Sequence, residues 1–190
     1  MKVNYINPQN IFGETFLDFD DNYLKQLIAS IELIRRGNIN GRAFSNLEFG
    51  WQSNFIPESG PFEKLTQSIC KEGYSLCKNI KDLNFTKIKM SGLWANINYK
   101  GDINWPHNHQ GDIAGVFYLQ VPEKSGSLFL HSYNYSNSIL GCHLQNSKGR
   151  IEIKPIKNKL VLFNACCYHY VGKSLSAIPR VSMSFNLDIN

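Results

Sequence analysis

Residues 105–121 read Trp-Pro-His-Asn-His-Gln-Gly-Asp-Ile-Ala-Gly-Val-Phe-Tyr-Leu-Gln-Val, so two histidines stand just before a long apolar run. Residues two apart on a β-strand project from the same face, which would let His107 and His109 converge on one ion. A third histidine, His169, follows far downstream. Three imidazoles on one side of a metal leave other coordination positions open for substrate or oxygen. The sequence therefore predicts a metal site that serves chemistry.

The composition indicates a single soluble domain. A chain of 190 residues can bury a core without disulfides or a structural metal. The net charge of +5 suits an anionic ligand, but the lysines are scattered and support nucleic-acid binding weakly. Five cysteines, an odd number, argue against a disulfide framework. With no apolar run long enough to span a membrane and no leader pattern, we expect a cytoplasmic protein without a membrane partner.

The chain changes from helical to β-rich patterns. Asp20 and Asp21 are candidate caps for an amphipathic helix that ends at residues 35–37, Arg-Arg-Gly, and a second helix is expected from about Pro61 to Lys78. From Phe85 onward, β-forming runs are separated by Gly, Asn and Pro. The predicted strands are 88–90, 93–99, 114–121, 126–131, 151–154, 159–163, 169–171 and 180–186.

About eight strands without a fixed repeat predict a mainly β fold, a double-stranded β-helix (jelly roll, cupin-like) flanked by two N-terminal helices. We expect one domain over residues 1–190, with a helical buttress at about 18–80 and a jelly-roll core at about 85–188. The cysteines then act as small buried apolar residues.

Arg180 stands in an apolar strand, where it alternates with Val181 and shares its face with Ser182. Burying a guanidinium is costly unless a carboxylate or phosphate pairs with it. The partner is either an acidic side chain of the protein or the carboxylate of a bound small acid, which the planar guanidinium fork suits.

The order of these motifs resembles the iron(II)/2-oxoglutarate-dependent oxygenase superfamily. It is most similar to a small 2OG-Fe(II) oxygenase branch with a prolyl-hydroxylase-like jelly roll. The resemblance spans about residues 50–186. Its motifs are His107-x-His109, 115–119 (GVFYL), 125–128 (SGSL), 160–163 (LVLF), His169 and 180–182 (RVS), together with 50–53 (GWQS), 94–96 (WAN) and 184–186 (SFN).

The resemblance implies iron(II) bound by His107, His109 and His169. It also implies 2-oxoglutarate bound to the iron through its keto and C1-carboxylate oxygens, with its far carboxylate on Arg180. Ser182 and Tyr118 match positions that hydrogen-bond this carboxylate, although Tyr118 could also be an ordinary core aromatic. The activity implied is consumption of O2, hydroxylation of an aliphatic C–H and release of succinate and CO2.

The chain departs from the superfamily at His109, where the common metal triad has Asp or Glu. A neutral imidazole in place of a carboxylate raises the net charge of the iron site by one. Either His109 is the ligand, or Asp112 reaches the metal through a turn or bulge.

Two other classes stay open on the sequence. A three-histidine dioxygenase of the cupin type would need no 2-oxoglutarate and would leave Arg180 without an acid to bind. A jelly-roll module for binding or assembly would need no metal at all. The sequence identifies neither the substrate nor the oligomeric state. The expected substrate is a small molecule or a protein side chain.

Overall fold

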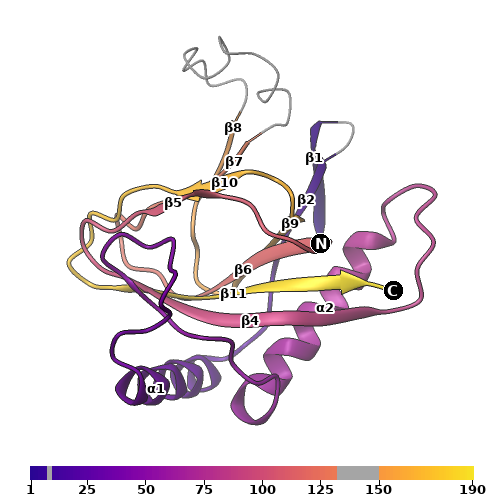
Figure 1. Ribbon diagram of the computed structural model, residues 1–190. Coiled ribbons are helices and arrows are strands. Elements are labelled where there is room, and N and C mark those ends of the chain that lie inside the picture. Colours follow the sequence, from indigo (N-terminus) through magenta and orange to yellow (C-terminus); the bar gives the residue numbers. More distant parts are fainter. Residues whose placement is uncertain (8–9, 132–149) are drawn as a thin grey trace.

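The computed structural model describes residues 1–7, 10–131 and 150–190, and it confirms the mainly β fold with flanking helices (Figure 1). Within this part of the chain the strands form two antiparallel sheets. The seven-stranded sheet has the order β1-β2-β9-β6-β11-β4-β3, and the four-stranded sheet has the order β5-β10-β7-β8. The strands are β1 Lys2–Asn7, β2 Asn10–Phe16, β3 Trp51–Gln52, β4 Ile88–Asn98, β5 Asn104–His107, β6 Ile113–Gln120, β7 Leu128–His131, β8 Arg150–Ile153, β9 Lys159–Asn164, β10 His169–Val171 and β11 Arg180–Ile189.

Both predicted helices are present. Helix α1 spans Asp21–Gly37, and its N-cap is Asp20, whose side chain accepts a hydrogen bond from the Tyr23 backbone N–H at 2.8 Å. Helix α2 spans Glu63–Cys77 and follows the 3₁₀ turn η1, Gly60–Phe62. Both helices lie against one face of the large sheet, and the small sheet lies on its other side (Figure 1). No helix in the described ranges is long and apolar enough to cross a membrane.

Successive side chains of β11 point alternately into the main core and into the space between the two sheets. Val181, Met183 and Phe185 point toward the helices and pack in the main core. Arg180 and Ser182 point into the space between the two sheets. A second apolar cluster closes the other part of this space, built by Tyr118, Val161 and Phe163 of the large sheet with Leu128, Leu130 and Ile153 of the small one. The site therefore lies between the sheets, away from the helices.

Several strands differ from the prediction. Strand β4 runs unbroken through Ser91-Gly92, which the sequence suggested as a break. An N-terminal hairpin, β1 and β2, joins the large sheet by pairing with β9, and the short strands β3 and β5 were also missed. These segments are short or rich in polar residues, so they lack the apolar run that indicates a buried strand.

Candidate active site

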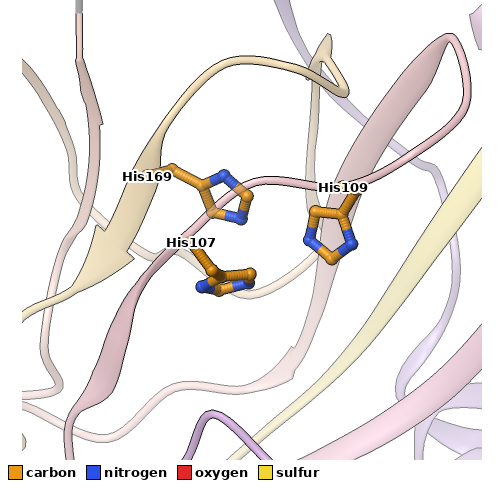
Figure 2. A group of neighbouring side chains, drawn as sticks. All are labelled: His107, His109 and His169. Atoms are coloured by element: carbon orange, nitrogen blue, oxygen red, sulfur yellow. The ribbon is translucent and has the colours of Figure 1, made fainter. Parts of the chain in front are cut away.

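Three histidines from separate parts of the chain meet between the sheets. His107 ends β5 and lies directly opposite His169 of β10 in the antiparallel ladder. His109 lies in the loop after β5, where its backbone N–H donates to the Ala165 carbonyl at 2.9 Å. Their candidate ligand atoms all lie within 4.8 Å of one another, and Figure 2 shows the three rings turned toward a common space. The prediction that one strand carries both His107 and His109 is wrong, since β5 ends at His107.

Backbone carbonyls orient two of the imidazoles. His107 Nδ1 lies 2.6 Å from the Trp105 carbonyl oxygen, and His169 Nδ1 lies 2.9 Å from the Cys167 carbonyl oxygen. A carbonyl can only accept, so each Nδ1 carries the proton and each Nε2 keeps a lone pair. This tautomer, fixed by a hydrogen bond from the other ring nitrogen, is the arrangement typical of metal-bound histidines.

Burial keeps these imidazoles neutral. Desolvation lowers the pKa of His107, lowers that of His109 to about 4 and lowers that of His169 well below its usual value. The positive charge of Arg42, and that of His107 whenever this ring is protonated, lower the pKa of His109 further. Neutral imidazoles can bind a metal without first losing a proton. Three converging neutral nitrogens form a donor set that fits a divalent transition metal such as Fe(II).

Asp112 lies away from this group. Its Oδ2 accepts a hydrogen bond from the Ile189 backbone N–H at 2.8 Å, and its side chain is exposed. No carboxylate among the described residues joins the three histidines. The geometry therefore favours His109 over Asp112 as the third ligand.

Arg180 lines the same cavity and is buried, 4% exposed. Its Nη1 donates to the Gly126 carbonyl at 2.8 Å, and its Nη2 donates to Asn98 Oδ1 at 2.6 Å. Its Nε is buried without a partner. None of the ion pairs formed within residues 1–7, 10–131 and 150–190 includes Arg180. Among these residues the guanidinium therefore forms no direct ion pair with an internal carboxylate, and it fits an acid bound in the cavity.

Ser182 and Tyr118 lie on the same side of the large sheet as Arg180. Strand pairing sets Ser182 directly opposite Tyr118 of β6 on one side and Asn96 of β4 on the other. The Arg180 Cζ lies 5.8 Å from the centre of the Tyr118 ring. Burial raises the pKa of Tyr118 to about 12, so its hydroxyl stays protonated and can donate to a carboxylate.

The three histidines, Arg180, Ser182 and Tyr118 all line one cavity of about 190 Å³. Polar residues that the sequence did not single out also line it. Gln52 Nε2 donates to Asn96 Oδ1 at 2.8 Å, and Asn96 Nδ2 donates to Ser184 Oγ at 2.9 Å. Gln52, Asn96 and Ser184 lie within quoted family motifs, which was an available signal, whereas Arg42 and Asn98 carried none.

A jelly roll whose polar cavity is lined by converging histidines, and by a buried guanidinium that forms no ion pair among the described residues, has the features of metal-dependent enzymes that bind a small organic acid. Residues 92–186 match the family described as "Putative 2OG-Fe(II) oxygenase", and the chain belongs to this family. Fe(II) is the metal of the family, and 2-oxoglutarate and O2 are its co-substrates. The histidine group fits Fe(II), and Arg180 fits 2-oxoglutarate.

Solved structures share the fold. A prolyl-4-hydroxylase from Pseudomonas putida aligns with a TM-score of 0.66 and 12% identity, over 92% of this chain and 91% of that one. A collagen prolyl hydroxylase of Paramecium Bursaria Chlorella virus-1, solved with 2OG, aligns with a TM-score of 0.60 and 15% identity, over 93% and 94%. HygX of Streptomyces hygroscopicus, solved with nickel, 2-oxoglutarate and hygromycin B, aligns with a TM-score of 0.67 and 9% identity, over 93% and 82%. No curated protein matches the sequence.

Proposed function

We propose that the protein is an Fe(II)/2-oxoglutarate-dependent dioxygenase that hydroxylates an aliphatic C–H of a small molecule or a protein side chain. In the overall reaction, substrate C–H, O2 and 2-oxoglutarate give substrate C–OH, succinate and CO2. One observation carries the proposal. A buried guanidinium that forms no ion pair with any described carboxylate lines the same cavity as three converging neutral imidazoles.

Each residue then has a role. His107, His109 and His169 would hold Fe(II), which when bound activates O2 for oxidation of the substrate. Arg180 would pair with the far carboxylate of 2-oxoglutarate, and the hydroxyls of Ser182 and Tyr118 would donate to the same group. Phe163 packs edge-on against His169, with the ring centres 4.7 Å apart, and helps to exclude water from the metal side.

Anaerobic addition of Fe(II) and 2-oxoglutarate tests the proposal directly. We expect a visible charge-transfer band, because an α-keto acid that chelates Fe(II) absorbs visible light. After admission of O2, succinate should form in a quantity equal to the 2-oxoglutarate consumed. A protein that stays colourless and forms no succinate would contradict the proposal.

No carboxylate from the described part of the chain joins the histidine group, which favours one second candidate, a three-histidine dioxygenase that does not use 2-oxoglutarate. Such an enzyme would bind Fe(II) with the same three residues but would show no band with 2-oxoglutarate. It would also leave the unpaired Nε of buried Arg180 without a function. The same experiment therefore separates the two candidates.

A further inference from the structure

A second arginine, Arg42, lines the cavity from the connection between α1 and α2. Its backbone N–H donates to the Gln52 carbonyl at 2.7 Å. The preceding Gly41 has φ +68°, and a Cβ there would lie 2.6 Å from the Gln52 carbonyl oxygen. Trp51 Nε1 donates to the Asn38 carbonyl at 2.9 Å and ties the same turn to β3. These hydrogen bonds thus hold the turn that carries Arg42 at the cavity.

Neighbouring aromatic rings, tilted against one another, connect Arg42 with His109. The Arg42 Cζ lies 5.3 Å from the centre of the Phe55 ring. The ring centres of Phe55 and Trp94 are 5.9 Å apart, and those of Trp94 and His109 are 5.6 Å apart. The side chain of Phe55 is 60% exposed. The cavity therefore has an aromatic wall that runs from an arginine toward the histidines.

The charge of this region is unbalanced. No Asp or Glu is among the described residues that line the cavity, and none of the ion pairs in this part of the chain includes Arg42. Glu48, on the same connection, instead accepts a hydrogen bond from Trp105 Nε1. When Fe(II) and 2-oxoglutarate are bound, their opposite double charges cancel. Buried Asp102, which is linked to Arg180 through Asn98, offsets the charge of Arg180, and the charge of Arg42 is left over. An uncompensated guanidinium beside a partly apolar wall favours an anionic ligand.

We infer that the substrate to be oxidised is a small organic acid. Its carboxylate pairs with Arg42, and its apolar body lies on Phe55 and Trp94, which brings a C–H toward the histidine group. A small molecule is favoured over a peptide because the cavity of about 190 Å³ also receives 2-oxoglutarate. This inference rests on the proposed function, since it assumes that Arg180 is occupied by the co-substrate.

The test compares an acid with its neutral amide. 3-Phenylpropionate and 3-phenylpropanamide have the same aromatic body, and their dissociation constants are measured by ligand-observed NMR on anaerobic protein loaded with Fe(II) and 2-oxoglutarate. A hydrogen-bonded ion pair should make the acid bind about tenfold more tightly than the amide. In Arg42→Gln this ratio should fall to near one. In Arg36→Gln, which removes an exposed charge at the end of α1, the ratio should be unchanged.

The visible band is recorded for each variant. It distinguishes a failure of the proposed function from a failure of the inference about the substrate. Wild-type protein without the band would contradict the proposed function. Protein that shows the band but binds the acid and the amide equally, or does not bind the acid, would overturn the inference about the substrate. A preference for the acid that persists in loaded Arg42→Gln would also overturn it, because another group would then hold the carboxylate. Arg42→Lys, which keeps the charge, should retain part of the preference.

Discussion

Arg180 and Asp102 are joined through one side chain, the amide of Asn98. Asn98 Oδ1 accepts from Arg180 Nη2 at 2.6 Å, and Asn98 Nδ2 donates to Asp102 Oδ2 at 2.7 Å. Asp102 Oδ1 accepts from the Phe49 backbone N–H at 2.8 Å. Since Asp102 is 1% exposed and can only accept, it fixes which way the amide points. The buried carboxylate thus orients Arg180 without touching it.

We therefore predict that Asp102 is a positioning residue for binding of 2-oxoglutarate. In Asp102→Asn the amide of Asn98 can turn over, and the KM for 2-oxoglutarate should rise about tenfold because a charge-assisted hydrogen bond is lost. The kcat at saturating 2-oxoglutarate should change less. Asp188→Asn, which removes an exposed carboxylate bonded to Ser91 Oγ, is the matched control. A fall in kcat at unchanged KM would contradict this role.

Arg180 should discriminate between α-keto acids that differ only in whether they carry a second, far carboxylate. Wild-type protein should bind 2-oxoglutarate about a hundredfold more tightly than 2-oxobutanoate, which lacks the far carboxylate, because a charged hydrogen-bonded pair contributes about 3 kcal/mol. In Arg180→Met this preference should disappear. Titration of the visible band with each acid gives the four affinities of a double-mutant cycle. If Arg180→Met still preferred 2-oxoglutarate over 2-oxobutanoate, a residue other than Arg180 would bind the far carboxylate.

Metal analysis distinguishes the three proposed metal ligands from Asp112. Replacing His107, His109 or His169 with Ala should abolish stoichiometric binding of Fe(II), since each would remove one of three ligands. Asp112→Asn should still bind one equivalent of Fe(II), because the Asp112 carboxylate accepts a hydrogen bond from the Ile189 backbone and lies away from the histidines. If Asp112→Asn lost the metal and His109→Ala kept it, the ligand set proposed here would be wrong.

The histidine pKa values also predict how stability depends on pH. An unfolded histidine has a pKa near 6.5, and burial lowers the pKa of His109 to about 4. As the pH falls from about 6.5 to 4, the unfolded chain takes up a proton that the metal-free folded protein does not. Stability should therefore decrease by up to about 3 kcal/mol for His109 alone.

Urea unfolding of the metal-free protein at pH 7, 6 and 5 measures this effect. The decrease should be smaller in His109→Gln, which has no group that titrates at this position. Equal pH dependence in the two proteins would show that His109 is not buried in its neutral form.

The elements with a strong local pattern could be predicted from the sequence. Helix α1 and strand β11 carry regular apolar periodicity, which one face of a packed element requires, and β9 is a short continuous apolar run, as a fully buried strand requires. The hairpin of β1 and β2 could not be predicted, because its pairing with β9 is a long-range contact that no local pattern encodes. Strand β5 has no apolar stripe and exists through its pairing with β10.

The residues of the candidate site also fall into those that the sequence could predict and those that it could not. His107, His109, His169 and Arg180 could be named because imidazoles at short spacing and a charge in an apolar strand are unusual on chemical grounds alone. That Asn98 and Arg42 line the cavity could not be predicted, since neither residue type is unusual where it stands. Their positions at the cavity depend on strand register and on a loop that folds back from the helices.

The sequence by itself determined the fold class, the apolar faces and the chemical groups available, because these follow from residue type and period. The tertiary structure decided that Asp112 turns away to the end of β11, that Arg180 has no carboxylate partner among the described residues, and that Arg42 reaches the cavity. These outcomes depend on distances between segments far apart in the chain, and such distances are set by how the two sheets pack.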